Sequence, residues 1–141
     1  MTHDPSDTLP QPGRVRFDAL VAQRLREPFA WGGNDCCLFA ADDVLALTGV
    51  DHAAGWRGTY SDARSAARVL AELGGLQALA ERAGPRVAPL GACVGDVGLV
   101  VHDGRELLAV CAGEVWLAPT AGGLAALPLN EAVCAWTVNH G

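Results

Sequence analysis

The residues best suited to chemistry lie within residues 29–42, where an aromatic and glycine-rich loop leads into an apolar segment. Cys36 stands at the start of that segment, directly after Asp35. A thiolate at a helix N-terminus is stabilised by unpaired backbone N–H groups and by the positive end of the helix dipole, so its pKa falls. Cys36 is therefore the candidate catalytic nucleophile. Asp35 is the predicted N-cap and a candidate orienting residue, and the capping role exists with or without catalysis.

Helices must position this cysteine. In the first half of the chain, apolar residues recur near a 3.6-residue period, and glycine or proline closes the runs. We expect helices over residues 15–26, 35–47, 62–73 and 76–82. Ser61 is the predicted N-cap of the third helix. The second helix would carry Cys36 on its first turn.

Beyond Pro89 the pattern changes to short β-rich runs divided by glycine. We expect strands over residues 96–102, 105–112, 114–118, 123–127 and 133–138. Asp103 and Gly104 separate the first two, and this dipeptide satisfies the positive φ angles of a type I′ hairpin turn. Helices followed by such a meander predict an α+β fold, with N-terminal helices packed on a small C-terminal antiparallel sheet.

The length of 141 residues predicts one domain. The polar, proline-rich residues 1–14 are predicted to form a flexible arm, and residues 15–141 the domain. A net charge of -6 gives no electrostatic footprint for nucleic acid or an anionic membrane. The longest apolar stretch is too short to span a bilayer, and the N-terminus does not resemble a signal peptide. The chain is expected to be soluble, to start in the cytoplasm and to need no cofactor.

The five cysteines are an odd number and match no CxxC or zinc-ribbon spacing, so no metal site is expected. Three of them lie in apolar runs and are expected to be small buried side chains: Cys93, Cys111 and Cys134. The adjacent cysteines Cys36 and Cys37 also raise the hypothesis of a thiol redox or metal-binding role, which stands beside the two functions described below. A disulfide between neighbouring residues requires a strained ring, which disfavours that role.

At the cysteine loop the chain resembles the papain-like cell-wall cysteine peptidases of the NlpC type. Their nucleophile motif runs aromatic, x, Trp-Gly-Gly, a short loop, then Asp-Cys-Ser-Gly, and Phe29, Trp31-Gly32-Gly33 and Asp35-Cys36 match it. Cys37 and Leu38 depart from it. The later Gly95-Asp96-Val97 is similar to the Gly-Asp-Leu strand of that family. The resemblance implies an NlpC-type fold with Cys36 as nucleophile.

The same resemblance implies a base histidine that opens the second strand of the sheet. Leu107 stands in its place here. His102 is the substitute candidate, because the predicted hairpin pairs it with Arg105 and puts it on the same sheet face as Leu107. It would lie roughly 7 Å from the expected position, at a rise of about 3.3 Å per residue. The sequence leaves open whether His102 reaches Cys36 through a register shift or is solvated.

Residues 17–138 also resemble a small family encoded among the tail genes of phages, prophages and gene transfer agents. That resemblance implies a tail-tip or tail-assembly protein, structural and with a degraded peptidase site, which moves from the host cytoplasm to the virion tail tip. Its expected partners are other tail-tip proteins such as the hub, with peptidoglycan as a further candidate. The alternative is an active murein endopeptidase with Cys36 as nucleophile.

Three more residues carry structural expectations. Trp31 either packs the nucleophile loop or lines a substrate groove, with packing favoured. Asp42 and Asp43 are expected to face solvent or an arginine, because no partnering acid stands at a suitable spacing.

Overall fold

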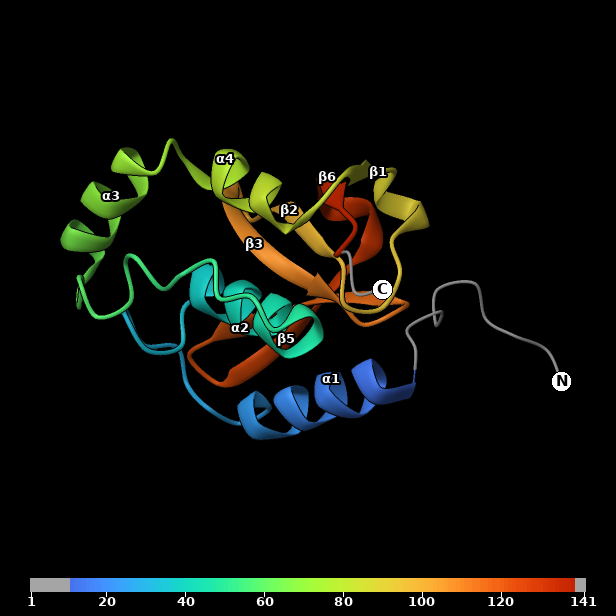
Figure 1. Cartoon of the computed structure of the whole chain (residues 1–141). Helices are drawn as coiled ribbons and strands as arrows, with labels where there is room; N and C mark the ends of the chain where they lie inside the picture. Colours follow the sequence, from blue (N-terminus) through green and yellow to red (C-terminus); the bar gives the residue numbers. More distant parts are fainter. Residues whose placement is uncertain (1–10, 139–141) are drawn as a thin grey trace, which may run out of the picture.

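Helices precede strands along the chain, and the strands form one antiparallel sheet (Figure 1). A computed structural model describes residues 11–138. The helices are α1 (Gln11–Arg24), α2 (Cys36–Thr48), α3 (Ala63–Glu72) and α4 (Leu76–Ala80). Short 3-10 turns cover Glu81–Ala83, Pro89–Gly91 and Leu129–Glu131. The predicted α+β class, with helices before the sheet, is confirmed.

Helix boundaries differ from the sequence expectations most clearly at the starts of α1 and α3, and α1 and α4 each end two residues earlier than expected. α1 begins at Gln11, so the predicted arm 1–14 overlaps the helix at residues 11–14, and residues 1–10 lie outside the described part. The N-cap of α3 is Asp62 and not Ser61. The Asp62 carboxylate accepts a hydrogen bond of 2.8 Å from the backbone N–H of Ser65, whose hydroxyl in turn accepts from the Asp62 N–H, so a capping box fixes the start one residue later.

The sheet has six strands in the order β1-β6-β2-β3-β4-β5. Their bounds are Arg86–Val87, Val97–His102, Arg105–Cys111, Val115–Thr120, Gly123–Pro128 and Ala132–Trp136 for β1 to β6. The two-residue β1, which the sequence analysis missed, pairs with the end of β6. So short a segment carries no periodicity by which to recognise it.

The hairpin of β2 and β3 has the predicted register, with His102 opposite Arg105 and Val100 opposite Leu107. Asp103 and Gly104 have φ angles of 52° and 75°, as a type I′ turn requires. This register decides which β3 side chains face the helices, because successive side chains of a strand alternate between faces.

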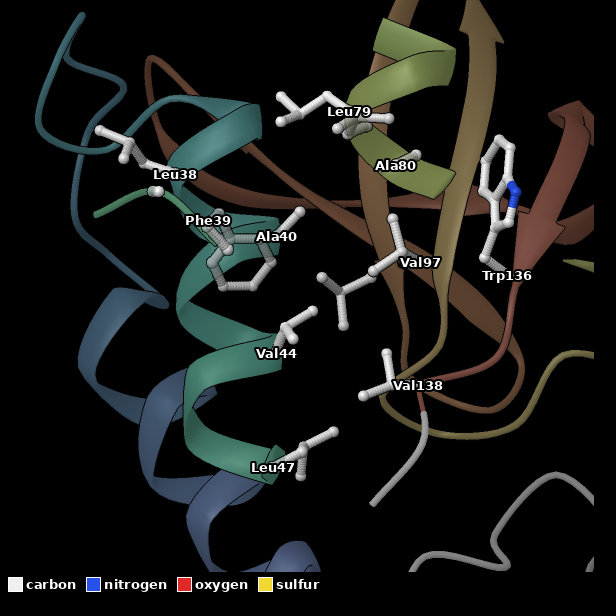
Figure 2. Close-up of a cluster of buried hydrophobic side chains, with 14 of the residues drawn as sticks. Leu38, Phe39, Ala40, Val44, Leu47, Leu79, Ala80, Val97, Trp136 and Val138 are labelled. Carbon is white, nitrogen blue, oxygen red and sulfur yellow. The ribbon is translucent and has the colours of Figure 1, made fainter. Parts of the chain in front are cut away.

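Each face of the sheet buries a separate hydrophobic cluster. The first lies between the sheet and the helices, where Val44 of α2 faces Val97 and Leu47 faces Val138 (Figure 2). The second lies on the opposite face and centres on Trp116, which sits directly over Gly98. A Cβ at Gly98 would lie 2.7 Å from the indole ring, so a side chain there would displace it.

α3 stands apart from the sheet, on the loops that join α2 to α4 (Figure 1). Of its ten residues only Val69 is buried, although the helix is strongly amphipathic. The apolar side of α3 consists of Ala66, Val69 and Leu70, and Leu73 follows directly after the helix. All four side chains belong to the first cluster or pack against it. The helix therefore presents an apolar face without being packed tightly on the core.

Candidate thiol site

The loop before α2 holds Cys36 at the helix N-terminus. Asp35 caps the helix as predicted, because one carboxylate oxygen accepts a 2.9 Å hydrogen bond from the backbone N–H of Leu38. The other oxygen accepts from the backbone N–H of Gly32 at 3.0 Å. Asp35 is 3% exposed, so these bonds replace the water that an ionised carboxylate loses on burial.

Tyr60 completes the partners of Asp35, and the sequence analysis did not single it out as a site residue. Its hydroxyl donates to the second Asp35 oxygen at 2.5 Å. Burial and this hydrogen bond to Asp35 raise the pKa of the Tyr60 hydroxyl above its ordinary value. Gly32 explains how the two segments come so close: its φ is +78°, and a Cβ there would lie 2.2 Å from the Tyr60 carbonyl oxygen. The Trp-Gly-Gly segment thus makes room for the loop that carries Tyr60.

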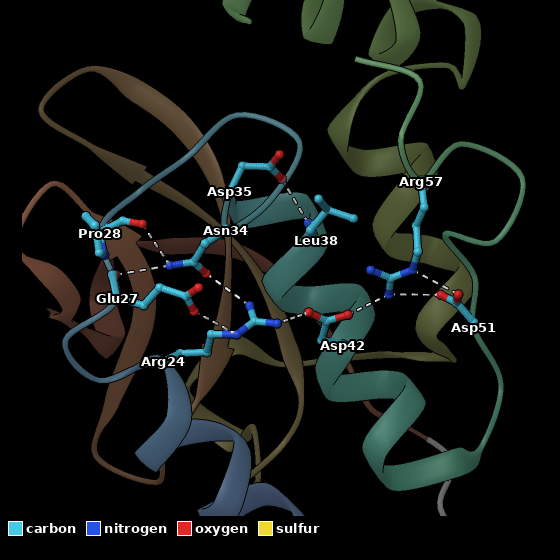
Figure 3. A network of polar contacts seen from close by, with 9 residues as sticks. All are labelled: Arg24, Glu27, Pro28, Asn34, Asp35, Leu38, Asp42, Asp51 and Arg57. Atoms are coloured by element: carbon cyan, nitrogen blue, oxygen red, sulfur yellow. Dashed lines mark hydrogen bonds and ion pairs between the residues drawn. The ribbon is translucent and has the colours of Figure 1, made fainter. Parts of the chain in front are cut away.

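A polar network holds the loop between α1 and α2 against these two helices (Figure 3). The Arg24 guanidinium donates to Asn34 at 3.0 Å and to Asp42. Asp42 also accepts from Arg57 at 2.5 Å, and Arg57 in turn binds Asp51. The expectation that Asp42 faces an arginine is confirmed. One α2 carboxylate therefore links the end of α1 to the loop that follows α2.

The Cys36 thiol faces the sheet, as the helix position predicts. Two hydrogen bonds lower its pKa below the ordinary value: one from the Cys37 thiol and one from the backbone N–H of Leu108 in β3. Burial and the nearby Asp35 charge oppose this effect without reversing it. Cys36 is half-buried as a residue and lines a cavity, so a thiol with a lowered pKa borders a space that a small molecule could occupy.

Cys37 lies beside Cys36 at the same cavity, although successive residues on a helix do not share a face. Its thiol donates to Cys36, and this bond together with burial raises the pKa of Cys37. Both side chains line the same cavity. The cavity extends over the end of α2, and two residues one step apart on a helix can both border such a space.

The cavity has a volume of about 220 Å³ and lies between the start of α2, α3 and α4. Its polar lining comes from Asp35, Cys36, Cys37, Tyr60 and Glu106, with Trp31 and Trp56 as aromatic walls. The rest is alkyl side chains, which are Ala63, Ala66, Ala67, Val69, Leu70, Leu73, Leu76 and Leu79. An apolar cavity with a few convergent polar groups is the usual form of a small-molecule site.

His102 lies on the other face of the sheet, where it cannot reach Cys36. It shares that face with Val100 of the second cluster, and its ring Nδ1 lies 3.0 Å from the Glu131 carboxylate. This contact raises the pKa of His102. Leu107, at the position implied for the base, packs on the same far face. The prediction that His102 and Leu107 share a sheet face is therefore right, but that face points away from Cys36.

Glu106 is the β3 residue that reaches the cysteine cavity, and the sequence analysis missed it. Strand alternation from buried Leu108 would have identified it, because Glu106 and Leu108 share a face. Of the described residues, none that lines this cavity is a histidine. The site therefore brings a cysteine pair together with carboxylates and a tyrosine.

Trp31 lines the cavity and is 45% exposed, so the favoured core-packing role is wrong. It leans edge-on against Phe29, with ring centroids 4.8 Å apart. Trp56 is 6% exposed, and its indole N–H has no acceptor in the part of the chain described. A buried donor without a partner costs about 1–3 kcal/mol. This unpaired N–H belongs to a wall of the cavity.

Asp43 departs from its expected place at the surface. It is fully buried, neither carboxyl oxygen has a hydrogen-bond partner in the described part, and burial beside Asp96 raises its pKa well above the ordinary value. The helical period explains the error: Asp43 lies between Phe39 and Leu47, each four residues away on the buried face.

The other cysteines are less uniform than expected. Cys111 is buried, and burial raises its pKa to about 11, whereas Cys93 and Cys134 are only half-buried. Within residues 11–138, no group of three or more His, Cys, Asp or Glu side chains is arranged to hold a metal ion. None of the helices in the described part is long and apolar enough to cross a membrane.

Comparison with known proteins identifies the family. Residues 11–138 match the family described as a domain of unknown function, DUF6950, so the chain belongs to that family. No curated protein and no solved structure matches the chain.

Proposed function

We propose that this DUF6950 protein is a structural component of phage or prophage tail tips, built on an NlpC-type scaffold whose peptidase site has lost its base. The single observation that carries the loss of the base is the place of Leu107 and His102, on the sheet face opposite Cys36. An amide-cleaving thiol needs a group that protonates the leaving amine. The sequence resemblance supplies the tail-tip role.

The surface gives the assembly role physical support. Five large apolar side chains within residues 11–50 are exposed, and they are Val15, Leu25, Trp31, Leu45 and Val50. Each of these side chains would lose contact with water if another protein covered it, which favours association. Other tail-tip proteins such as the hub are the proposed partners, met first in the host cytoplasm and then held in the virion.

Photo-crosslinking in intact particles tests this role. A p-benzoylphenylalanine at Val15 is expected to crosslink to a neighbouring tail protein, whereas the same group at exposed Gln77 serves as the matched control. Recovery of the chain only as a free protein, absent from purified particles, would contradict the tail-tip role.

An active murein endopeptidase is the second candidate, and the lowered pKa of Cys36 beside a cavity favours it. Zymography separates the two functions. We expect negligible murein hydrolysis, because the proton-transfer contribution of about 10² to 10⁴ in rate is missing. Lysis that is lost in Cys36→Ser and retained in Cys37→Ser would establish the peptidase.

A further inference from the structure

The cysteine cavity has the chemistry of an alkyl-chain site. Its long walls are the apolar side of α3, which includes Leu70, together with Leu73 just after that helix and Leu79 of α4. An apolar cavity of about 150 Å³ binds benzene, and at roughly 30 Å³ for each water-sized group a volume near 220 Å³ accommodates about seven methylenes. An amphipathic helix that faces such a space gains stability when an apolar ligand fills it.

The Trp56 indole ring forms part of the cavity wall, and its N–H is buried within the protein. This N–H has no acceptor in the described part of the chain. The apolar side chains around the ring fit the alkyl chain of a ligand.

The missing base selects the reaction. Amide cleavage requires protonation of the leaving amine, for which the cavity has no imidazole. In a thioester, the leaving group is a thiolate, which departs without a proton when its pKa is near that of the attacking thiol. Cys36, hydrogen-bonded by Leu108 and Cys37, is suited to this exchange.

We propose that Cys36 accepts a medium-length acyl chain from a phosphopantetheine thioester, and that the cavity between α2, α3 and α4 holds the chain. The Cys36 sulfur attacks the thioester carbonyl, a carbon–sulfur bond to Cys36 forms, and the bond to the donor sulfur breaks. The donor leaves as a thiolate and takes up the proton that the Cys36 thiol has lost. The electron count is unchanged, and no oxidant or reductant takes part.

A neighbouring cavity explains the choice of an anionic donor. It has a volume of about 400 Å³ and shares Trp56, Val69 and Leu73 with the first. Its charged lining is Arg68, Arg82 and Glu72, so two guanidinium groups face one carboxylate. Arginine guanidinium groups bind phosphate through paired, charge-assisted hydrogen bonds. The phosphates of the donor would lie there while its acyl chain enters the cysteine cavity.

Carboxylates on the cysteine cavity also discriminate among donors. Asp35 and Glu106 both line it, so the charged head of a free fatty acid would meet like charges. A thioester is neutral at the reacting end. The geometry therefore favours an activated acyl donor over the free acid.

Mass spectrometry of the full-length chain tests the acyl transfer. Incubation with octanoyl coenzyme A is expected to add one octanoyl group, which neutral hydroxylamine removes, and peptide mapping should place it on Cys36. Cys36→Ser should abolish the modification, whereas Cys134→Ser, a half-buried cysteine outside the cavity, should retain it. Equal modification of Cys36→Ser and the unmutated chain would overturn the proposal.

Filling the cavity separates acyl binding from simple thiol reactivity. Leu70→Trp is expected to lower the octanoyl transfer rate by about tenfold or more, while acetyl transfer from acetyl coenzyme A and alkylation by iodoacetamide persist. Leu73→Trp is a second variant in the same wall, should the first fail to fold by circular dichroism. Equal octanoyl transfer by a folded cavity-filled variant would contradict the chain site.

The donor class has its own comparison. Octanoyl coenzyme A should react faster than the small thioester octanoyl-N-acetylcysteamine, and Arg68→Ala with Arg82→Ala should remove that advantage. An octanoylated acyl carrier protein distinguishes a protein-borne donor from the free coenzyme. No rate difference between the large and small thioesters would overturn the phosphopantetheine assignment. These outcomes are independent of the tail-tip role, which particle crosslinking tests.

Discussion

Glu106 and Leu107 are neighbours on β3 and face opposite sides of the sheet: Glu106 lines the cysteine cavity, and Leu107 packs on the second cluster. A histidine restored at the position implied by the NlpC resemblance would therefore enter an apolar layer and not the thiol site.

Leu107→His should destabilise the protein without activating it. Burying an imidazole among apolar side chains costs about 1–3 kcal/mol of unfolding free energy. Glu106→His, at an exposed position, should change it by less than about 0.5 kcal/mol. Urea unfolding of both variants measures the difference, and equal stabilities would contradict the assignment of faces.

Loss of the Tyr60 hydroxyl should weaken the loop that carries Cys36. Tyr60→Phe removes the 2.5 Å bond to Asp35, and a hydrogen bond to a charged group is worth about 1.5–3 kcal/mol. Thermal or urea unfolding would report this loss. Thr59→Ser, next to it on the chain and exposed, keeps the hydroxyl that donates to the Trp56 carbonyl oxygen at 2.6 Å, and as the control it should cost less.

Asp43 should make the protein less stable as pH rises. Its pKa is raised in the folded state, so the stability penalty is absent below the unfolded pKa of about 3.9 and grows as pH rises towards the folded pKa. Asp43→Asn removes the cost of staying protonated and should stabilise the protein by about 1–3 kcal/mol at pH 7. Unfolding curves from pH 4 to 8 measure both effects. A variant that keeps the unmutated pH slope would contradict this account.

His102 should give a pH dependence of the same sign as Asp43, because its pKa is also raised in the folded state, but its low-pH form stabilises the fold. Its pKa is raised by Glu131, so the stabilisation is fully present below the unfolded pKa of about 6.5 and is lost as pH rises through the folded pKa. An NMR titration should find the His102 pKa lowered in Glu131→Gln. Iodoacetamide alkylation of Cys36 should be unchanged in His102→Ala, and a slower rate would show that the imidazole acts on the thiol.

Cys37 should tune the reactivity of Cys36. Cys37→Ala removes the thiol donor, so the alkylation profile of Cys36 should move to higher pH. Cys37→Ser keeps a hydroxyl donor and should move it less. Quantifying Cys36 alkylation by mass spectrometry between pH 5 and 9 measures both shifts, and coincident profiles would contradict the hydrogen bond.

Local patterns predicted what local physics determines. The Asp35 cap and the Asp103 turn each depend on residues within a few positions, and both appear as expected. The start of α3 was wrong by one residue, because two side chains competed for the same capping role. Which of two neighbouring side chains caps a helix depends on small differences in local geometry, and the residue types alone do not determine it.

The site was less predictable because it joins distant segments. Nothing near Tyr60 in the sequence indicates that its hydroxyl meets Asp35, 25 positions away. To predict that His102 points away from Cys36, one must know which face of the sheet α2 covers. The hairpin register alone does not give that information. Asp43 was predicted at the surface because it carries a charge, whereas its spacing from Phe39 and Leu47 in the helix places it on the buried face.

The detached position of α3 makes access to the thiol a matter of local opening. With one buried residue in ten, this helix can separate from its neighbours at a smaller free-energy cost than global unfolding. Its amides should exchange with deuterium faster than those of buried β3, and a filled cavity should slow them. The rate at which a reagent modifies Cys36 would then depend on the local opening of α3, while the sheet stays folded.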